Sequence, residues 1–493
     1  MHQSRLSEDV ERRSTQSSAG RIVLPMHRSQ PGVRAARIML FVAGDAVALI
    51  VAALSAYVLW ALPARHQSLA LYTSISPLIS IFLLGYGQSS LYPGFGLGPV
   101  EILRRLSYVT IFGFLIVAAI SFALKVPPLY SRVTFTIALG FSLIFVPLMR
   151  ALISYCARGW NWWCEPVVVI GAGERAARAI RGIRQALHLG YQPVAVLSYG
   201  TDFSHGHVEG VPIVGVIDDA MTLSENGIRI AVLEIDESQS RAFLDRLQQQ
   251  FRHVLLLRHH YDLPVEGLNV RNFGTLIGIE YTNNLLVKSN EVIKGLLDVA
   301  IGFCALILAA PVIACAAVAV KLIDGGPAFF FQDRAGRNGR RIRVPKIRTM
   351  AMDAEKELKN YLDATPGARE EWETHHKLRD DPRLVPYVGR FFRRFSIDEL
   401  PQLWTVLVGD MSLVGPRPFP DYHLRKFSPD FLELRQRVRP GITGLWQVTV
   451  RSEGGIGEQE AYDSYYIRNW SVWLDIYLLS RTLATVISGR GAY

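Results

Sequence analysis

Apolar residues gather in long blocks over the first third of the chain. Stretches at residues 38–62, 69–87, 106–124 and 133–149 each approach the roughly 20 apolar residues that a membrane-spanning helix needs. The fourth is short, and Ser, Thr and Gln interrupt the second. The pattern predicts an N-terminal bundle of four transmembrane helices over residues 35–155.

Positive charge is distributed unevenly around these stretches. The segment before the first stretch, the connection at 88–105 and the exit after residue 149 are richer in arginine than the short connections around Arg65 and Lys125. The positive-inside rule therefore predicts that both ends of the bundle lie in the cytoplasm. Asp45 falls inside the first stretch, where it is either a functional intramembrane acid or, in the simpler account that we favour, an acid facing the bundle interior.

The pattern changes at residue 165 to short apolar runs that alternate with amphipathic segments. "PVVVIGAGERAARAIRGIRQ" is typical of a buried strand, a Gly171-x-Gly173-x-x-Ala176 turn and a helix, which predicts a Rossmann-like nucleotide-binding-like domain over 165–280. The glycines either approach a dinucleotide or make a tight strand-to-helix turn. We favour the turn, because the next strand is not followed directly by an acid that could bind a ribose.

An uncharged run from Val299 to Val320 follows, and it is long enough to cross a membrane. Pro311 lies in the middle of the run, where it removes a helical hydrogen bond and favours a kink. The run is therefore either a fifth span or a helix that bends and leaves the membrane on the side from which it entered.

The remaining chain is basic and mixes helix and strand signals. "GPAFFFQDRAGRNGRRIRVPKIRTM" predicts a strand, a turn at "GRNG" and a second strand, and "MDAEKELKNYL" predicts an amphipathic helix. In "DDPRLVPYVGRFFRRFS" arginines alternate with aromatic residues, as on a solvated or lipid-facing helix surface. This part of the chain is predicted to be a mixed α/β domain over 285–493.

Composition supports a membrane protein with anionic partners. The 493 residues are 50% hydrophobic, with a mean hydropathy of +0.20 and a net charge of +10, which fits anionic lipid or phosphate. Apart from the solvated or lipid-facing segment "DDPRLVPYVGRFFRRFS", the chain has no basic helix with interleaved aromatics, so no nucleic-acid partner is predicted. Residues 1–34 are polar and basic without a signal-peptide pattern, which predicts a disordered tail.

Candidate chemistry is densest in "FSIDELPQLWTVLVGDMSLVGPRP", which covers residues 395–418. The adjacent Asp398 and Glu399 are either catalytic or part of a capping box with Ser396, in which they only begin a helix. Arg417 lies between two prolines. Either its guanidinium is a rigid bidentate phosphate ligand, or the residue is part of a surface turn.

From Lys288 to Tyr493 the chain resembles the bacterial polyprenyl-phosphate sugar-1-phosphate transferases, the monotopic phosphoglycosyl transferases. The resemblance is carried, in order, by "GPAFFFQDRAGRNG", "KIRTM", "DPRLVPYVGRFFRRFSIDELPQLWTVLVGDMSLVGPRP", "RPGITGLWQV" and "YYIRNWSVWLDIYLL". With its bundle and Rossmann-like domain, the chain is similar to the long members typified by undecaprenyl-phosphate galactose phosphotransferase. The sequence departs from the family pattern at Ala310-Pro311, Ile347 and Val450, where serine before the proline, an aromatic residue and glycine are usual.

The resemblance implies a reaction and a location. A sugar 1-phosphate, galactose before glucose, would pass from a UDP-sugar to undecaprenyl phosphate with release of UMP, beginning exopolysaccharide or O-antigen synthesis. The enzyme would lie in the bacterial inner membrane, with its catalytic domain in the cytoplasm and residues 292–323 re-entrant at Pro311. The partners implied are the UDP-sugar, undecaprenyl phosphate and membrane lipid, and a homodimer is compatible with the sequence.

The resemblance also implies roles for individual residues. Asp398 would be the nucleophile and Glu399 the ligand of a Mg²⁺ ion, while Arg417 and Lys346 would neutralise phosphate oxygens. Substrate-binding roles are expected for Arg439, Gly441, Gly444, Gln447 and Asp475.

Two other functions stay open on the residues alone. A nicotinamide-dependent nucleotide-sugar oxidoreductase or epimerase rests only on the Gly171–Ala176 turn and lacks a Tyr-x-x-x-Lys pair beside that domain. A non-catalytic membrane scaffold for polysaccharide assembly is the third hypothesis, and release of UMP from a UDP-sugar separates the three.

Overall fold

The structure is a computed structural model in which two compact units, Met1–His259 and His260–Tyr493, are each described by themselves. The described residues are 31–63, 76–123, 131–157, 159–160, 163–171, 173–198, 206–225, 227–234, 247, 249–257, 268–273, 276–281, 284–365, 369, 381, 383–449 and 455–488. Residues 1–30 of the predicted tail lie outside the described residues. Residues 31–34, which were predicted to belong to the tail, are helical, so the tail ends before residue 31.

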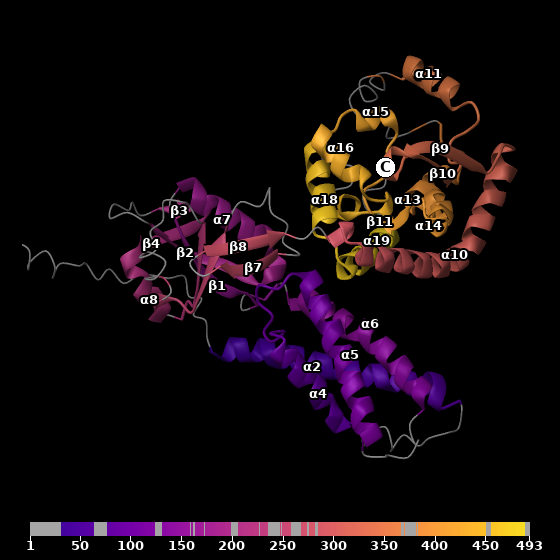
Figure 1. Cartoon of the computed structure of the whole chain (residues 1–493). Coiled ribbons are helices and arrows are strands. Elements are labelled where there is room, and N and C mark those ends of the chain that lie inside the picture. Colours follow the sequence, from indigo (N-terminus) through magenta and orange to yellow (C-terminus); the bar gives the residue numbers. More distant parts are fainter. Residues whose placement is uncertain are drawn as a thin grey trace, which may run out of the picture. The chain divides into compact units, whose positions relative to one another are not determined.

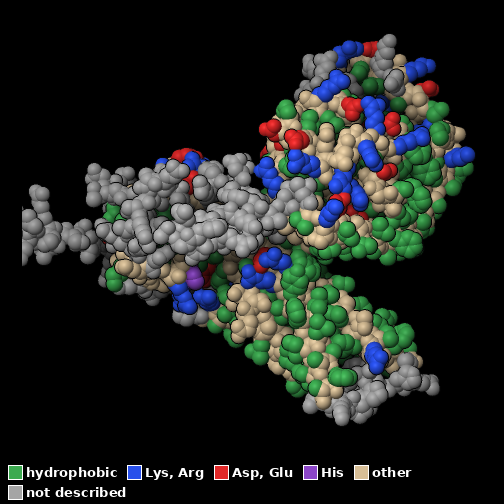
Figure 2. Space-filling view, in the orientation of Figure 1, with side chains coloured by type: hydrophobic (Ala, Val, Ile, Leu, Met, Phe, Trp, Pro, Cys, Tyr) green, Lys and Arg blue, Asp and Glu red, His purple; other side chains and the backbone are tan. Residues whose placement is uncertain are grey.

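The first unit begins with a bundle of apolar helices whose surface is covered by hydrophobic side chains (Figure 2). Its elements are α2 (Pro31–Ala56), the π-helical turn η1 (Tyr57–Ala61), η2 (Ser76–Leu78), α4 (Ile79–Gln88), α5 (Pro99–Ala123) and α6 (Arg132–Ala157). The helices at Arg34–Ala61, Pro99–Ala123 and Arg132–Ala157 are long and apolar enough to cross a membrane. The second predicted span is described only from residue 76, as a short apolar helix.

A buried ion pair holds the bundle together. Asp45 is fully buried and accepts hydrogen bonds from Arg150 Nε at 2.9 Å and from the Tyr92 hydroxyl at 2.7 Å. Arg150 also donates to the carbonyl of Leu91 at 3.1 Å. The acid therefore faces the bundle interior, as the simpler account predicted, and its charge is compensated there.

A six-stranded sheet forms the rest of the first unit, in the order β3-β4-β2-β1-β5-β6 (Figure 1). All strands are parallel except β3, which pairs antiparallel with β4. The bounds are β1 (Glu165–Ile170), α7 (Gly173–Gln185), η3 (Leu187–Leu189), β2 (Tyr191–Ser198), β3 (His207–Val208), β4 (Val211–Val216), η4 (Ile217–Asp219), α8 (Ala220–Glu225), β5 (Ile230–Glu234) and β6 (His253–Leu257).

Both faces of the central strands β1, β2 and β5 are buried, which explains why these strands are uninterrupted apolar runs. Val167 and Val169 of β1 pack with Ile180 of α7, while Val168 and Ile170 pack on the opposite face. The predicted strand, glycine turn and helix are confirmed, and Gly171 and Gly173 have φ angles of +156° and +58°.

The second unit is a mixed α/β domain built from three small sheets and several helices. The strand pairs are β7 (Leu268–Phe273) with β8 (Leu276–Tyr281), β9 (Phe329–Ala335) with β10 (Arg341–Ile347), and the parallel β11 (Ser412–Val414) with β12 (Gly441–Thr443). The turn η6 (Arg337–Gly339) joins β9 to β10, as "GRNG" predicted. The helical elements are η5 (Asn284–Leu286), α10 (Lys288–Asp324), α11 (Ala354–Ala364), α13 (Gly389–Arg394), η7 (Ile397–Gln402), α14 (Leu403–Leu407), α15 (Asp421–Leu424), α16 (Pro429–Gln436), α17 (Leu445–Thr449), α18 (Ile456–Arg468) and α19 (Val472–Ser488).

The longest helix, α10, contains Pro311 and changes direction along its length in Figure 1. It is also long and apolar enough to cross a membrane. Hydrophobic side chains cover the part of the second unit along α10 (Figure 2), and Leu308 and Leu322 are about four-fifths exposed.

Candidate active site

Two adjacent acidic residues lie on a short 3₁₀-helix at the centre of the second unit. Asp398 and Glu399 belong to η7, which packs against β10 and α10. The predicted capping box with Ser396 is not formed, because Ser396 has a left-handed backbone (φ +52°) and makes no side-chain capping bond. Glu399 turns instead toward two basic residues.

Glu399 is the acceptor that joins three distant segments of the sequence. Its Oε1 accepts from Lys346 Nζ at 2.8 Å and from Arg417 Nη2 at 2.7 Å. Burial by itself raises the pKa of Glu399, but the charges of Arg417 and Lys346 and their hydrogen bonds outweigh burial and hold it well below its usual range. The two basic residues therefore favour the ionised form of Glu399.

Asp398 lies in the same group of charges but is held differently. It is nine-tenths buried, and the described residues supply no hydrogen bond or ion pair to its carboxylate. Burial and the negative charge of Glu399 raise the pKa of Asp398 to about 6, against the opposing effect of Lys346, Arg393 and Arg417. At pH 7 the group is mainly ionised and free to react.

Two further arginines near this pair were not among the predicted site residues. Arg393 of α13 acts electrostatically on Asp398 and is fixed by a bond from its Nε to Thr349 Oγ1 at 3.1 Å. Arg334 of β9 lies near Arg417 and Glu399 and donates from Nη1 to the carbonyl of Pro418 at 3.3 Å. The sequence signal for Arg393 was present in "GRFFRRFS", where we interpreted the arginines only as a helix surface.

Gly441 and Gly444, both predicted site residues, pack against the backbone of Gly415 at the start of the Arg417 loop. A Cβ on Gly441 would lie 2.1 Å from the amide nitrogen of Gly415, and one on Gly444 would lie 2.4 Å from the Gly415 carbonyl oxygen. Close backbone approach is therefore confirmed, but the partner is Gly415, two residues before Arg417.

The other predicted substrate ligands are not joined to the acidic pair by any contact among the described residues. Gln447 donates from Nε2 to the carbonyl of Ile442 at 3.0 Å. The Arg439 side chain lies beside Gly295 of α10 and lines a pocket that also includes Glu291. A substrate contact for Gln447 and for Arg439 therefore stays a prediction.

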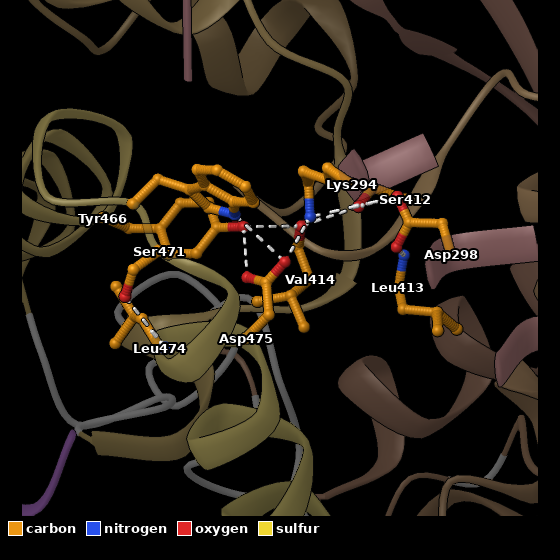
Figure 3. A network of polar contacts seen from close by, with 10 residues as sticks. Lys294, Asp298, Ser412, Leu413, Val414, Tyr466, Ser471, Leu474 and Asp475 are labelled. Atoms are coloured by element: carbon orange, nitrogen blue, oxygen red, sulfur yellow. Dashed lines mark hydrogen bonds and ion pairs between the residues drawn. The ribbon is translucent and has the colours of Figure 1, made fainter. Parts of the chain in front are cut away.

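Asp475 belongs to a separate buried network, shown in Figure 3. Its Oδ2 accepts from Lys294 Nζ at 2.7 Å and from Trp470 Nε1 at 3.0 Å, and its Oδ1 accepts from the Tyr466 hydroxyl at 2.8 Å. On the other side of Lys294, Asp298 accepts from Ser412 Oγ at 2.7 Å. This bonding favours a structural role for Asp475, which links α19 to α10, over the predicted substrate contact.

A metal ion would have to be held mainly by Glu399. No group of three or more acidic, histidine or cysteine side chains suited to a metal occurs in the described part of the chain. The two hydrogen bonds to Glu399 both end on Oε1, so within the described residues Oε2 keeps its lone pairs free. One carboxylate together with substrate phosphates is a usual ligand set for Mg²⁺, so the residues fit that ion.

An acidic pair surrounded by cations, on a domain with a long apolar helix, fits a membrane-associated enzyme that transfers phosphate-bearing groups. The bacterial sugar transferase family matches residues 289–489, and the CoA-binding domain family matches residues 96–229.

Individual relatives extend this match beyond the second unit. An uncharacterized sugar transferase of Haemophilus influenzae is 33% identical over 399 residues, which cover 80% of this chain and 83% of that protein. The undecaprenyl-phosphate galactose phosphotransferase of Salmonella typhimurium is 31% identical over 80% of this chain and 82% of its own length. The UDP-glucose:undecaprenyl-phosphate glucose-1-phosphate transferase of Escherichia coli is 31% identical over 56% of this chain and 58% of its own length.

The chain belongs to the bacterial sugar transferase family. The predicted family and enzyme class are thereby confirmed, as is the predicted order of apolar helices, Rossmann-like sheet and α/β transferase domain.

Proposed function

We propose that this enzyme transfers a sugar 1-phosphate from a UDP-sugar to undecaprenyl phosphate and releases UMP, through a covalent intermediate on Asp398. The names of the Salmonella and Escherichia relatives support the lipid acceptor and the class of reaction. The product would be the first lipid-linked sugar of an exopolysaccharide or O-antigen.

The observation that carries the proposal is the different bonding of two neighbouring carboxylates. Glu399 neutralises Lys346 and Arg417, whereas Asp398 accepts no hydrogen bond from the described residues. A nucleophile needs free lone pairs, which Asp398 keeps because no described residue donates to it. It also needs an ionised state, which a pKa of about 6 provides at pH 7. Asp398 therefore suits attack on phosphorus, and Glu399 suits organisation of the charges around it.

In the first half-reaction a carboxylate oxygen of Asp398 bonds to the sugar-bearing phosphorus of the donor. The bond from this phosphorus to the bridging oxygen breaks, and the oxygen leaves with its electron pair as part of UMP. Arg417 and Lys346 stabilise the charge that accumulates on the phosphoryl oxygens, and Arg417 can hold two oxygens at once. The same two residues bridge to Glu399, so they are positioned before the donor arrives.

Glu399 would also hold the proposed Mg²⁺ through Oε2. When bound, Mg²⁺ lowers the cost of negative charge on the diphosphate.

In the second half-reaction a phosphate oxygen of undecaprenyl phosphate attacks the same phosphorus. The Asp398 carboxylate leaves, and the lipid diphosphate sugar is formed. The covalent intermediate lets two anionic substrates enter one small site in turn, so the lipid phosphate meets a single phosphoryl group and not the whole diphosphate of the donor. Ping-pong kinetics follow from this order.

We propose that α10 re-enters the membrane at Pro311 and does not span it. Its first turns are tied to the catalytic domain by Lys294 and Asp298, and its last turns pack Ala316 and Val320 against Ile347. Arg348 is paired with Asp324 at the end of the helix at 2.5 Å. Contact of both ends with one small domain supports the proposal that both ends lie on one side of the bilayer.

Single cysteines test this topology. Val287 and Phe330 flank α10 and are 38% and 50% exposed, so Val287→Cys and Phe330→Cys are accessible to reagents. In a background without Cys156, Cys164, Cys304 and Cys315, a membrane-impermeant maleimide should label both positions from the same side. Labelling from opposite sides would establish a fifth span. The donor requires that side to be the cytoplasm of the bacterial inner membrane.

The covalent step is tested without lipid acceptor. Purified protein, Mg²⁺ and a panel of UDP-sugars should yield UMP equivalent to the enzyme and a sugar phosphate on Asp398 by intact mass and peptide mapping. Galactose is the first expected sugar and glucose the second, in line with the named relatives. Asp398→Asn should give neither adduct nor UMP. If UMP forms only when lipid is added and kinetics show a ternary complex, direct displacement replaces this mechanism.

A further inference from the structure

Arg417 lies in a loop whose four consecutive backbone carbonyls, at residues 416–419, accept hydrogen bonds. Pro416 and Pro418 have no N–H, so each of these two residues can form a backbone hydrogen bond only through its carbonyl oxygen. The acceptors follow one another along the chain: Pro416 O receives Gly441 N at 2.9 Å, Arg417 O receives Arg435 Nη2, Pro418 O receives Arg334 Nη1 at 3.3 Å, and Phe419 O receives Ala335 N at 3.2 Å.

Arg435 is the only one of these donors that bonds to the backbone of Arg417 itself. It lies on α16 and is 7% exposed. Its guanidinium stacks over Phe419 at 4.9 Å and lies 5.9 Å from the Phe427 ring. Its Nη1 faces Asp463 Oδ2 of α18 at 3.6 Å, which is outside close hydrogen-bond distance.

We infer that Arg435 is a positioning residue for the transfer reaction, which fixes the Arg417 backbone so that its guanidinium meets Glu399. The inference rests on the role proposed above for Arg417. A buried cation is stabilised by whichever acceptors surround it, and the Arg417 carbonyl is the close acceptor here. Asp463 Oδ2 lies 3.6 Å from Nη1 of the Arg435 guanidinium, and the centre of the Phe419 ring lies 4.9 Å from its carbon.

A purely structural role would not need a cation at this position. A buried ion pair is often replaced by well-packed apolar residues without loss of stability, because desolvation offsets the attraction. Burial lowers the pKa of Arg435 to about 10 and raises that of Asp463 to about 7, so burial disfavours the charged form of each group. An apolar residue at position 435 could not donate a charged hydrogen bond to the Arg417 carbonyl.

Steady-state release of UMP from the full chain in detergent or nanodiscs tests this role. Arg435→Met should lower kcat by about 100-fold, the loss expected when a catalytic group is misplaced by about 1 Å. The KM for the UDP-sugar should change by less than about threefold, because the other donor contacts remain. Arg437→Met is the matched control, since Arg437 is exposed and pairs only with Glu433 among the described residues. It should keep wild-type kinetics.

A double-mutant cycle separates positioning from general damage. If Arg435 acts through Arg417, then Arg435→Met should change the residual rate of Arg417→Ala by less than about threefold, because no side chain remains to be positioned. Radiolabelled donor allows such slow rates to be measured. Losses that multiply in the double variant would overturn the inference.

Arg435→Met leaves Asp463 buried without a counter-charge and can fail to fold. Arg435→Met combined with Asp463→Asn removes both charges and the donor to the Arg417 carbonyl, and is compared with Asp463→Asn alone. A wild-type kcat in the folded double variant refutes the positioning role. A wild-type protein that releases no UMP from any UDP-sugar refutes the proposed function instead.

Discussion

Asp398→Asn should make the protein more stable while it abolishes turnover. Asp398 is nine-tenths buried, and its pKa is about 6 in the folded protein against 3.8 ordinarily. At about 1.4 kcal/mol for each pKa unit, its ionised form disfavours the folded state by about 3 kcal/mol at pH 7. Asparagine has nearly the same shape and cannot ionise, so the variant avoids this cost.

The sign of the pH dependence follows from the same difference. Between pH 4 and pH 6 the unfolded chain releases the proton of Asp398 while the folded protein retains it, so wild-type stability falls across this window. Below about pH 4 both states are protonated and the advantage of asparagine disappears.

Thermal unfolding of the purified protein in nanodiscs, followed from pH 4 to pH 8, measures the effect. For a domain of about 200 residues, 2–3 kcal/mol corresponds to a rise in Tm of roughly 5–10 °C at pH 7 and above. Asp410→Asn is the control, because Asp410 is exposed in the same motif. An asparagine variant that is equally or less stable at pH 7, or a difference that does not vary with pH, would refute the assignment of Asp398 as a desolvated, ionised carboxylate.

Three further outcomes are expected. Arg417→Lys should stay folded and lose roughly 100-fold in kcat, because a point charge replaces a planar fork; exposed Arg425→Lys is its control, and near-normal turnover in the Arg417 variant would exclude the role. The kcat/KM for UMP release should fall below an apparent pKa near 6 as Asp398 takes up its proton, and a flat profile down to pH 5 would contradict this. Gly441→Ala should lower the free energy of unfolding by at least about 2 kcal/mol, because its Cβ would collide with the Gly415 backbone. Gly457→Ala, with open space around it, is the control and should not destabilise the protein. Equal stability of both variants would show that Gly441 and Gly415 are not in close contact.

The elements of this protein were largely readable from local patterns. Apolar runs of membrane length gave the long helices, and the β9–β10 hairpin follows from two strand patterns around "GRNG". The strand, glycine turn and helix at residues 165–185 also appear as predicted. These features depend on neighbours within a few residues, and the sequence states that information directly.

The active site was predictable in its composition and only partly in its arrangement. The structure brings Asp398, Glu399, Arg417 and Lys346 together, and their catalytic roles stay a prediction. From the sequence alone, the capping box was an equally good local explanation of the two acids. Choosing between the explanations required the contact of Glu399 with Lys346, 53 residues away along the chain.

Only the tertiary structure decided which residues support the site and which remain free to react. Arg435 and Arg334 hold the Arg417 loop by bonds to carbonyls, and a backbone carbonyl has no signature in the sequence of side chains. The identities of Asp398 and Glu399 made both residues candidates for either role. Their difference in proton affinity arises from burial and from the distances to surrounding charges, which are properties of the folded arrangement and not of the order of residues.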